Sequence, residues 1–363
     1  MADRWLDEQV SQLRPATQAI YRGNVRRYLR PRWGERRLDA IHVSDAARLV
    51  RELRAQGLSE WTIAGVLGVA SRVFKFARRH CSWRGDNPLV DMEKGERPRL
   101  SQRPERRTYV GSELAEVLAA ADEPWRTLFR LASVVGARES ELLGLWWEDL
   151  ELRDLDAATI RFGFQADRDG DRVELKTEES RATLPLPRST ALMLLEHKAR
   201  TPAPTSARSF VFGTRTGRSL SQRNVLRALY RAQERARNAD ELPTFPELFE
   251  HDRLGHLVVD DDGEFVPAKV RRRELRLPDF HALRHGAAMD CEDAEEARDL
   301  LRHKNSNVTR AIYRAHFGDR RRELLRARME ARMEATGQST SVPASEASAR
   351  DPALQHEERR GSA

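Results

Sequence analysis

The sequence predicts a mainly α-helical protein with a small antiparallel β-sheet. Apolar residues recur at helical spacing through most of the first 150 positions, and again after residue 190. Short runs rich in β-branched and aromatic residues, separated by polar turns, lie between positions 159 and 186 and predict strands. A chain of 363 residues is long enough for two domains that each bury a core.

The composition favours a nucleic-acid partner. The chain carries 64 lysines and arginines against 57 acidic residues, a formal net charge of +7, and only six of the basic residues are lysines. An arginine bias partly reflects GC-rich coding, but guanidinium groups also bind phosphate through two parallel hydrogen bonds. A moderate basic excess therefore favours contact with a phosphate backbone.

Several classes of protein are disfavoured by what the sequence lacks. No apolar run approaches the roughly 18–20 residues of a membrane span, so no membrane partner is expected. The charged, periodic N-terminus is unlike a signal peptide. Two cysteines, Cys81 and Cys291, argue against a disulfide framework or a cysteine-based zinc site, which favours a reducing cytoplasm. A glycine-rich phosphate loop is also missing, which argues against a nucleotide hydrolase.

Residues 1–93 are predicted to form a helical domain. Proline, serine and glycine at the expected ends divide it into helices. The first helix carries apolar Trp5, Val10 and Leu13, and a second helix starts at Pro15 and breaks at Pro31 and Gly34. A third helix starts at Ser44 and Asp45 and ends at Gly57. A fourth helix is capped by Ser59, and Asn87-Pro88 closes the domain.

Basic residues in and after this domain are the DNA-binding candidates. Residues 94–107 (KGERPRLSQRPERR) are rich in proline and basic residues, which predicts an extended linker able to follow a phosphate backbone. A solvated helix face and a plain flexible hinge are the alternatives. The candidates are Arg22, Arg26, Arg27, Arg30, Arg97, Arg99, Arg103, Arg106 and Arg107.

Residues 108–335 are predicted to form a mixed α/β domain. Gly136 ends one helix, and ARESELLGL begins another at Arg138. Strands at 159–162, 172–176 and 181–186 predict a three-stranded sheet with Lys176 at a strand end or turn. Helices follow at 190–200 and 221–239, then an irregular insertion at 240–276 with a hairpin around Asp-Asp-Gly. Leu325, Met329 and Met333 mark a last helix, and the tail 336–363 is rich in Ser, Thr, Pro, Ala and Glu, which predicts disorder.

The stretch from His281 to Tyr313 gathers the groups that phosphate chemistry needs. A phenol, imidazoles and a guanidinium together suit nucleophilic attack on phosphorus. Taken alone, Tyr313 is more often a half-buried packing residue. His281 and His285 lie one helical turn apart, but HALRH lacks the glutamate of a zinc-protease motif, so no metal is expected.

Four motifs in order resemble those of the tyrosine recombinase, or phage integrase, family. ARESELLGL is similar to the first arginine box, LKTEESRATLPLP to the β-hairpin lysine and following strand, HALRH to the His-x-x-Arg-His box, and LLRHKNSNVTRAIYRAH to the nucleophile box. One box would be weak, whereas four in order behind a basic helical domain are specific. The likeness implies a SAM-like core-binding domain at 1–93 and a recombinase catalytic domain at 108–335.

The resemblance assigns the covalent chemistry to four residues. Tyr313 would attack the scissile phosphate, leaving a 3′-phosphotyrosyl link whose retained energy removes any need for ATP or another cofactor. Arg138 and Arg284 would bind the non-bridging oxygens as charge develops on phosphorus. Lys176 would protonate the leaving 5′-oxygen.

Four further residues have supporting roles, and one position departs from the family pattern. His281 would assist proton removal from Tyr313, and His303 would donate a hydrogen bond to the phosphate. Glu141 would orient the guanidinium of Arg138, and His285 would pack behind the site. Arg302 stands where the family commonly has glycine before the second histidine, so the turn presenting His303 is expected to differ.

The same resemblance implies partners and a location. A C-shaped clamp around double-stranded DNA is expected, assembled as a tetramer on paired recombination sites, with accessory DNA-bending or directionality factors as further partners. The Leu325–Met333 stripe would either pass to a neighbouring subunit or cover its own domain. The resemblance also implies that the protein is bacterial or phage-encoded, cytoplasmic and associated with the nucleoid. The alternatives are a Xer-like chromosome or plasmid resolvase, a telomere-resolving enzyme, and a catalytically silent DNA-binding or regulatory protein derived from a recombinase.

Overall fold

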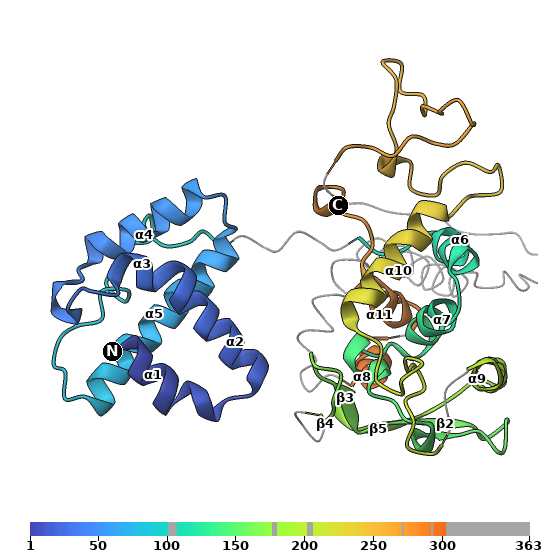
Figure 1. Cartoon of the computed structure of the whole chain (residues 1–363), viewed down its shortest axis with the longest axis horizontal. Helices are drawn as coiled ribbons and strands as arrows, with labels where there is room; N and C mark the ends of the chain where they lie inside the picture. The colour runs from blue at the N-terminus through green and yellow to red at the C-terminus, as the bar shows by residue number, and fades with distance from the viewer. Residues whose placement is uncertain (101–106, 176–179, 202–205, 271, 292, 303–363) are drawn as a thin grey trace, which may run out of the picture.

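The predicted fold class is confirmed in a computed structural model of the chain, which is mainly helical with two small antiparallel sheets (Figure 1). The structure describes residues 1–100, 107–175, 180–201, 206–270, 272–291 and 293–302. One hydrophobic core lies on each side of positions 101–106, built from residues 5–92 and from residues 117–283, and a small third cluster joins Ala288, Ala297 and Leu301. In the described part of the chain, no helix is long and apolar enough to cross a membrane.

The first unit consists of helices around one long central helix. Its elements are α1 (Ala2–Glu8), α2 (Pro15–Asn24), a π-helical turn (Val25–Leu29), α3 (Arg30–Trp33), α4 (Val43–Ala55) and α5 (Glu60–His80). Helix α5 begins at the predicted cap, where the Ser59 side chain accepts the Thr62 N–H. Ile63, Val66 and Val69 of this helix are almost wholly buried against α4 and α1.

The predicted break at Pro31 and Gly34 is wrong in its first half. The helix continues through Pro31 to Trp33 because the backbone widens into a π turn just before the proline. In an α-helix the proline ring collides with the carbonyl four residues earlier, and a wider turn relieves that collision. Accordingly, the Arg30 N–H donates to the carbonyl of Val25, five residues back. Gly34 does end the helix, and a Cβ there would lie 2.6 Å from the Arg30 carbonyl oxygen.

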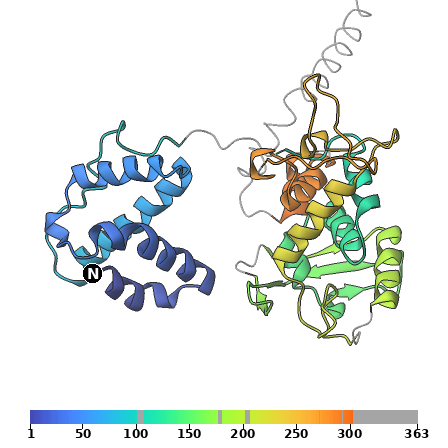
Figure 2. The same ribbon diagram turned by 45° about the horizontal axis from the view of Figure 1, so that its top comes forward.

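The second unit packs helices on two small sheets. Its helices are α6 (Glu113–Ala120), α7 (Trp125–Val135), α8 (Glu139–Leu143), α9 (Arg188–Arg200), α10 (Gln222–Arg235), α11 (Phe280–Met289) and α12 (Ala294–Leu301). Helix α7 is central, with contacts to α6, α9, α10 and α11. Figure 2 shows the strands gathered on one side of this unit, away from α6.

The strands do not form the single three-stranded sheet that was predicted. Strands β1 (Leu150–Glu151), β2 (Thr159–Phe162) and β5 (Ala182–Pro185) form one antiparallel sheet in the order β1-β2-β5. The middle predicted strand instead pairs as β4 (Arg172–Glu174) with β3 (Phe164–Ala166) in a separate hairpin. Lys176 itself lies outside the described residues. Strand β3 was not predicted, because only Gly163 separates it from β2 and no polar turn marks its start.

The insertion at 240–276 contains the predicted hairpin. Val259 pairs with Phe265 across a turn in which the Asp260 carboxylate accepts the backbone N–H groups of Asp262 and Glu264, at 3.0 and 2.9 Å. A similar turn is built on Asp252. Figure 1 shows this segment, between α10 and α11 in the chain, as loops that extend beyond the helices.

Candidate active site and nucleic-acid interface

In the first arginine box, the carboxylate of Glu141 contacts Arg138 at two places, the backbone N–H and the guanidinium. Arg138 is the N-cap of α8, its backbone N–H donates to Oε2 of Glu141 at 2.9 Å, and its Nη1 contacts Oε1 of the same residue at 2.5 Å. Glu141 is completely buried, whereas the Arg138 side chain is 38% exposed. The guanidinium is thus held from the protein side with its other edge reaching solvent.

Glu141 also binds a second arginine, Arg302, at the C-terminal end of α12. Nη2 of Arg302 lies 2.7 Å from Oε2 of Glu141, and both side chains are buried. Burial opposes ionisation of Glu141, but Arg302 and Arg138 outweigh it and hold its pKa below the usual value. Glu141 is therefore a carboxylate at neutral pH, and it neutralises part of the charge of two guanidinium groups.

Arg284, on α11, ties three helices together beside this pair. Its side chain is buried, and it donates to the carbonyl oxygens of Gly136, at the end of α7, and Leu301, at the end of α12. Burial, reinforced by the nearby charge of Arg138, lowers the Arg284 pKa to about 9. It remains protonated at neutral pH.

Gly136 makes this convergence possible. Its φ of +56° is in the left-handed region that glycine favours, and it ends α7 as the sequence predicted. A Cβ at this position would lie 3.0 Å from Cδ2 of Leu301 and 3.5 Å from Cβ of Ala287. Helices α11 and α12 therefore approach the end of α7 as closely as a glycine allows, which brings the two predicted boxes to one place.

The two histidines of HALRH lie on one face of α11, as their spacing predicts. Asp279 caps this helix by accepting the Ala282 N–H, and the rings of His281 and His285 meet edge to face with centroids 4.7 Å apart. Both histidines are half-buried. Within the described ranges, no group of three or more His, Cys, Asp and Glu side chains is placed to hold a metal ion.

Lys176, His303 and Tyr313 lie outside the described residues, as does the Leu325–Met333 stripe. The residues that precede two of them are described. Arg302 precedes His303 and contacts Glu141, while Leu175 precedes Lys176 and is buried next to β3 with its N–H on the Gly163 carbonyl.

Arg172, which the sequence reasoning did not single out, fixes the β3–β4 hairpin to the arginine box. Its guanidinium lies 3.6 Å from the ring centroid of Phe164 and 4.2 Å from that of Trp146. It also contacts buried Asp149 at 2.6 Å and donates to the carbonyl of Gly144 at 3.0 Å. Such a cation held between aromatic faces holds a strand in place, and no periodic pattern in the sequence marks it.

Two close packing details complete the box. Gly144 allows the hairpin to cross α8, since a Cβ there would lie 2.5 Å from the backbone of Gln165. Glu139, next to Arg138, was also missed: burial, with a smaller contribution from Asp279, raises its pKa to about 7.

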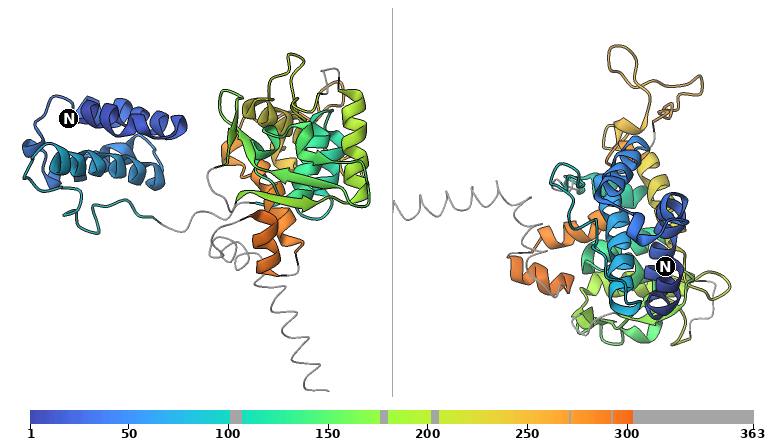
Figure 3. Two further views of the ribbon diagram at one scale, coloured as in Figure 1. Left: turned by 90° about the horizontal axis from the view of Figure 1, so that it is seen from below. Right: turned by 90° about the vertical axis from the view of Figure 1, so that its left-hand side faces the viewer.

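Four of the DNA-binding candidates gather on the first unit. Arg22, Arg26, Arg27 and Arg30 are exposed and line a hollow of about 630 Å³ along α2 and the π turn. Arg30 pairs with Asp3 in α1. Arg26 and Arg27 make no ion pair with any described residue. In the left view of Figure 3, the dark blue helices of this unit, α2 among them, lie along one of its faces.

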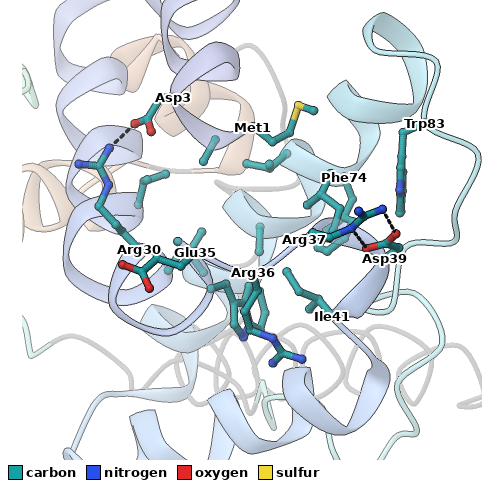
Figure 4. A pocket seen from close by; sticks show the side chains of 18 residues that line it. Met1, Asp3, Arg30, Glu35, Arg36, Arg37, Asp39, Ile41, Phe74 and Trp83 are labelled. Atoms are coloured by element: carbon teal, nitrogen blue, oxygen red, sulfur yellow. Dashed lines mark hydrogen bonds and ion pairs between the residues drawn. The ribbon is translucent and has the colours of Figure 1, made fainter.

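A second hollow, of about 670 Å³, lies beside the first and shares Asp3, Val25 and Arg30 with it (Figure 4). Two ion pairs, Asp3–Arg30 and Arg37–Asp39, lie at its edges, and the Phe74 and Trp83 rings face each other in its wall with centroids 5.6 Å apart. Its arginines are paired with carboxylates, Arg36 with Asp45 among them, and Glu35 adds a negative charge. It is therefore a less suitable phosphate site than the arginine-lined hollow, where Arg26 and Arg27 have no ion pair with a described residue.

The remaining candidates differ in what holds them. Arg97 donates to the carbonyls of Val90 and Met92, at 2.6 and 2.8 Å, and so caps a turn of the first unit. The backbone N–H of Arg99 contacts Glu60 at 2.6 Å. Arg107 forms ion pairs with Glu113 and Glu247 of the second unit, where a phosphate would have to compete with two carboxylates. Arg103 and Arg106 lie outside the described residues.

Comparison with known proteins gives one sequence relative and several structural ones. A protein called tyrosine recombinase XerC-like, from Caldanaerobacter subterraneus subsp. tengcongensis, is 27% identical over 261 residues, which are 64% of this chain and 65% of that protein. The sequence matches no family model. The Tn1549 transposon integrase, in complex with transposon right end DNA, superposes with a TM-score of 0.66 at 18% identity over 90% of this chain and 99% of that one.

The integrase of lambda, as a tetramer bound to a Holliday junction, gives a TM-score of 0.58 at 18% identity over 85% of this chain and 75% of that one. Sequence and fold together support the tyrosine recombinase and integrase family. The family resemblance predicted from the motifs is thereby confirmed. The chemical roles of the individual residues stay predictions, and the relative's match extends over less than two thirds of its own length.

Proposed function

We propose that the protein is a site-specific DNA recombinase, an integrase that cleaves and rejoins duplex DNA through a 3′-phosphotyrosyl intermediate. The observation that carries the proposal is the convergence of Arg138 and Arg284, which come from segments far apart in the chain. Glu141 grips Arg138 at 2.5 Å, and Arg284 binds the carbonyl of Gly136, two residues before Arg138. The Arg138 guanidinium reaches solvent and the buried Arg284 guanidinium is fixed beside it, an arrangement of positive charge that suits a phosphate group.

The covalent step assigns each bond to a residue. The Tyr313 oxygen forms a bond to phosphorus, the bond from phosphorus to the 5′-oxygen breaks, and Lys176 gives that oxygen its proton. Arg138 and Arg284 stabilise the charge on the non-bridging oxygens, because donors already in place need no rearrangement during the reaction. His281 takes part in removing the tyrosine proton, and His303 donates to the phosphate.

The arrangement of the first unit supports duplex DNA as the substrate. Exposed arginines, Arg26 and Arg27 above all, supply attraction to the phosphate backbone that does not depend on sequence. By analogy with its structural relatives, the protein would act as a tetramer on paired sites in the bacterial cytoplasm, integrating or excising a mobile element. Accessory DNA-bending factors would assist it.

The experiment begins by finding the DNA site. Duplexes that the full-length protein binds are selected from a random library, and the selected duplex is then made with a nick near the cleavage position. Loss of the short fragment prevents religation, so a covalent adduct should accumulate and be visible on a denaturing gel. Tyr313→Phe should bind the duplex equally well and form no adduct. An adduct in Tyr313→Phe would reject the nucleophile, and salt-sensitive binding without any adduct would indicate a catalytically silent DNA-binding protein.

A second experiment isolates the general acid. Lys176→Ala should cleave the ordinary duplex slowly, because the 5′-oxygen leaves poorly without a proton. Replacing that bridging oxygen by sulfur should restore cleavage, since a thiolate leaves without an acid. Failure of the sulfur substrate to restore cleavage would remove this role from Lys176.

A further inference from the structure

Arg302 has a backbone conformation that its side chain does not favour. It is the C-cap of α12, with φ of +53° and ψ of +47°. Residues with a Cβ adopt this left-handed region at a cost, and helices therefore commonly end there with glycine. The position tolerates an arginine in place of that glycine, so the contacts of its side chain must compensate.

The side chain is buried and tied to three elements. Only 1% of it is exposed, although a buried charge is unfavourable unless it is paired. Its guanidinium lies 2.7 Å from the carboxylate of Glu141 in α8, and 4.2 Å from the ring centroid of Phe162 in β2. Its Nη1 donates to the Leu300 carbonyl of its own helix at 3.1 Å.

These contacts complete the surroundings of Glu141. One carboxylate oxygen of Glu141 contacts Nη1 of Arg138, and the other accepts the backbone N–H of Arg138 and Nη2 of Arg302. With both oxygens engaged on fixed partners, the carboxylate has one orientation. That carboxylate in turn orients the guanidinium of Arg138. Arg302 therefore influences the orientation of Arg138 through Glu141.

We propose that Arg302 is a positioning residue that fixes the phosphate-binding guanidinium of Arg138 by acting through Glu141. This inference rests on the proposed function and deepens it. Arg302 also directly precedes His303, so the same ion pair fastens the chain before the predicted histidine to the arginine box. A recombinase with glycine at this position would have to fix its glutamate by other contacts.

The experiment compares two substrates that differ in phosphate charge. One nicked duplex carries the ordinary phosphodiester at the cleavage position, and the other carries a methylphosphonate, which is neutral there. Arg138 stabilises the charged phosphate more strongly, so the ratio of the two cleavage rates measures how well Arg138 is placed. A role confined to folding would slow both substrates alike and leave the ratio unchanged.

The variants are Arg302→Met, which keeps length without charge, Arg302→Lys, which keeps one charge, and Arg302→Gly. The matched control is Arg298→Met, a half-exposed residue of the same helix. Arg302→Met should cleave the phosphodiester roughly 10- to 100-fold more slowly, as expected for a displaced catalytic contact, with a reduced ratio. Arg302→Lys should recover part of that loss. In the Arg138→Ala background, Arg302→Met should change the ratio no further.

Each outcome decides the proposal. Equal slowing of the two substrates by Arg302→Met, or a wild-type ratio in folded Arg302→Gly, would overturn it. Should the wild-type protein bind the duplex and form no adduct, the proposed chemistry fails by itself. The role of Arg302 is then tested by the ratio of the dissociation constants of the two duplexes, which replaces the ratio of cleavage rates. A protein that binds neither duplex rejects both proposals.

Discussion

Two pairs of arginines, one pair in each unit of this protein, are held in opposite ways. In the second unit, Arg284 and Arg302 are about 1% exposed, and each contacts named carbonyl or carboxylate oxygens. In the first unit, the side chains of Arg22 and Arg30 are 47% and 57% exposed, and their acidic partners, Asp7 and Asp3, are exposed too. Buried arginines have a fixed geometry, whereas exposed arginines have attraction without a fixed geometry.

The difference separates two demands of the proposed reaction. Holding a phosphate while charge develops on it needs donors that are already in place, which burial and pairing supply. Finding and following a duplex needs only a positive surface, which salt screens. Changes in the buried group should therefore affect stability and chemistry, and changes in the exposed group should affect binding and its salt dependence.

The largest effect is expected from Glu141→Gln. It removes the carboxylate that faces two guanidinium groups, leaving buried Arg302 without its counter-charge. The free energy of unfolding should fall by about 3–5 kcal/mol, measured by urea denaturation. The matched control Glu148→Gln removes a half-exposed carboxylate near Arg172 and Arg208 and should cost less than about 1 kcal/mol. Equal losses in the two variants would contradict the buried network.

Arg138→Ala should act on chemistry more than on stability, because its side chain is 38% exposed. Adduct formation on the nicked duplex should slow by roughly 10²–10³-fold, the usual effect of losing one preorganised donor. The affinity for the duplex should change little. Arg22→Ala serves as the comparison from the first unit, and it should leave the rate of adduct formation within about threefold of wild type when the duplex is saturating.

Glu139 should make stability depend on pH. Its pKa is raised from 4.5 to about 7 by burial, so the folded protein keeps this proton longer than the unfolded chain does. The stabilisation is complete below about pH 4.5 and is lost as pH rises toward about 7, with a total of order 1–2 kcal/mol after allowance for partial exposure. Glu139→Gln should reduce this pH-dependent decrease in the free energy of unfolding, measured by urea denaturation at several pH values. The control variant Glu151→Gln, at an exposed position, should leave the decrease unchanged. An unchanged slope in Glu139→Gln would contradict the assignment.

The smallest effects should come from Arg26→Ala and Arg27→Ala. Each should lower affinity for any duplex by a few-fold and reduce the slope of log K against log salt by about 0.9, one phosphate contact. Fluorescence anisotropy over a range of salt concentrations measures both. Arg107→Ala is the informative contrast. Because Arg107 is paired with Glu113 and Glu247, this substitution should leave the slope of log K against log salt unchanged. A reduced slope there would show that Arg107 contacts phosphate after all.

Local signals in the sequence predicted much of the fold. The left-handed end of α7 at Gly136, the cap at Ser59 and the hairpin around Asp260 were predicted, because each depends on a few neighbouring residues. Pro31 misled the prediction, since a proline normally ends a helix and nothing local indicated a π turn. The strand partners were also misassigned, because pairing depends on segments distant in the chain.

For the candidate site, the sequence by itself determined the order of the motifs and the residue types that could carry the chemistry. Only the tertiary structure decided how they support one another. Glu141 serves both Arg138 and Arg302, and Arg284 binds the ends of two other helices. The physical reason is that a pattern along the chain records which side of its own helix a residue faces. A buried ion pair instead depends on which helices meet, and that is settled by the packing of the whole unit.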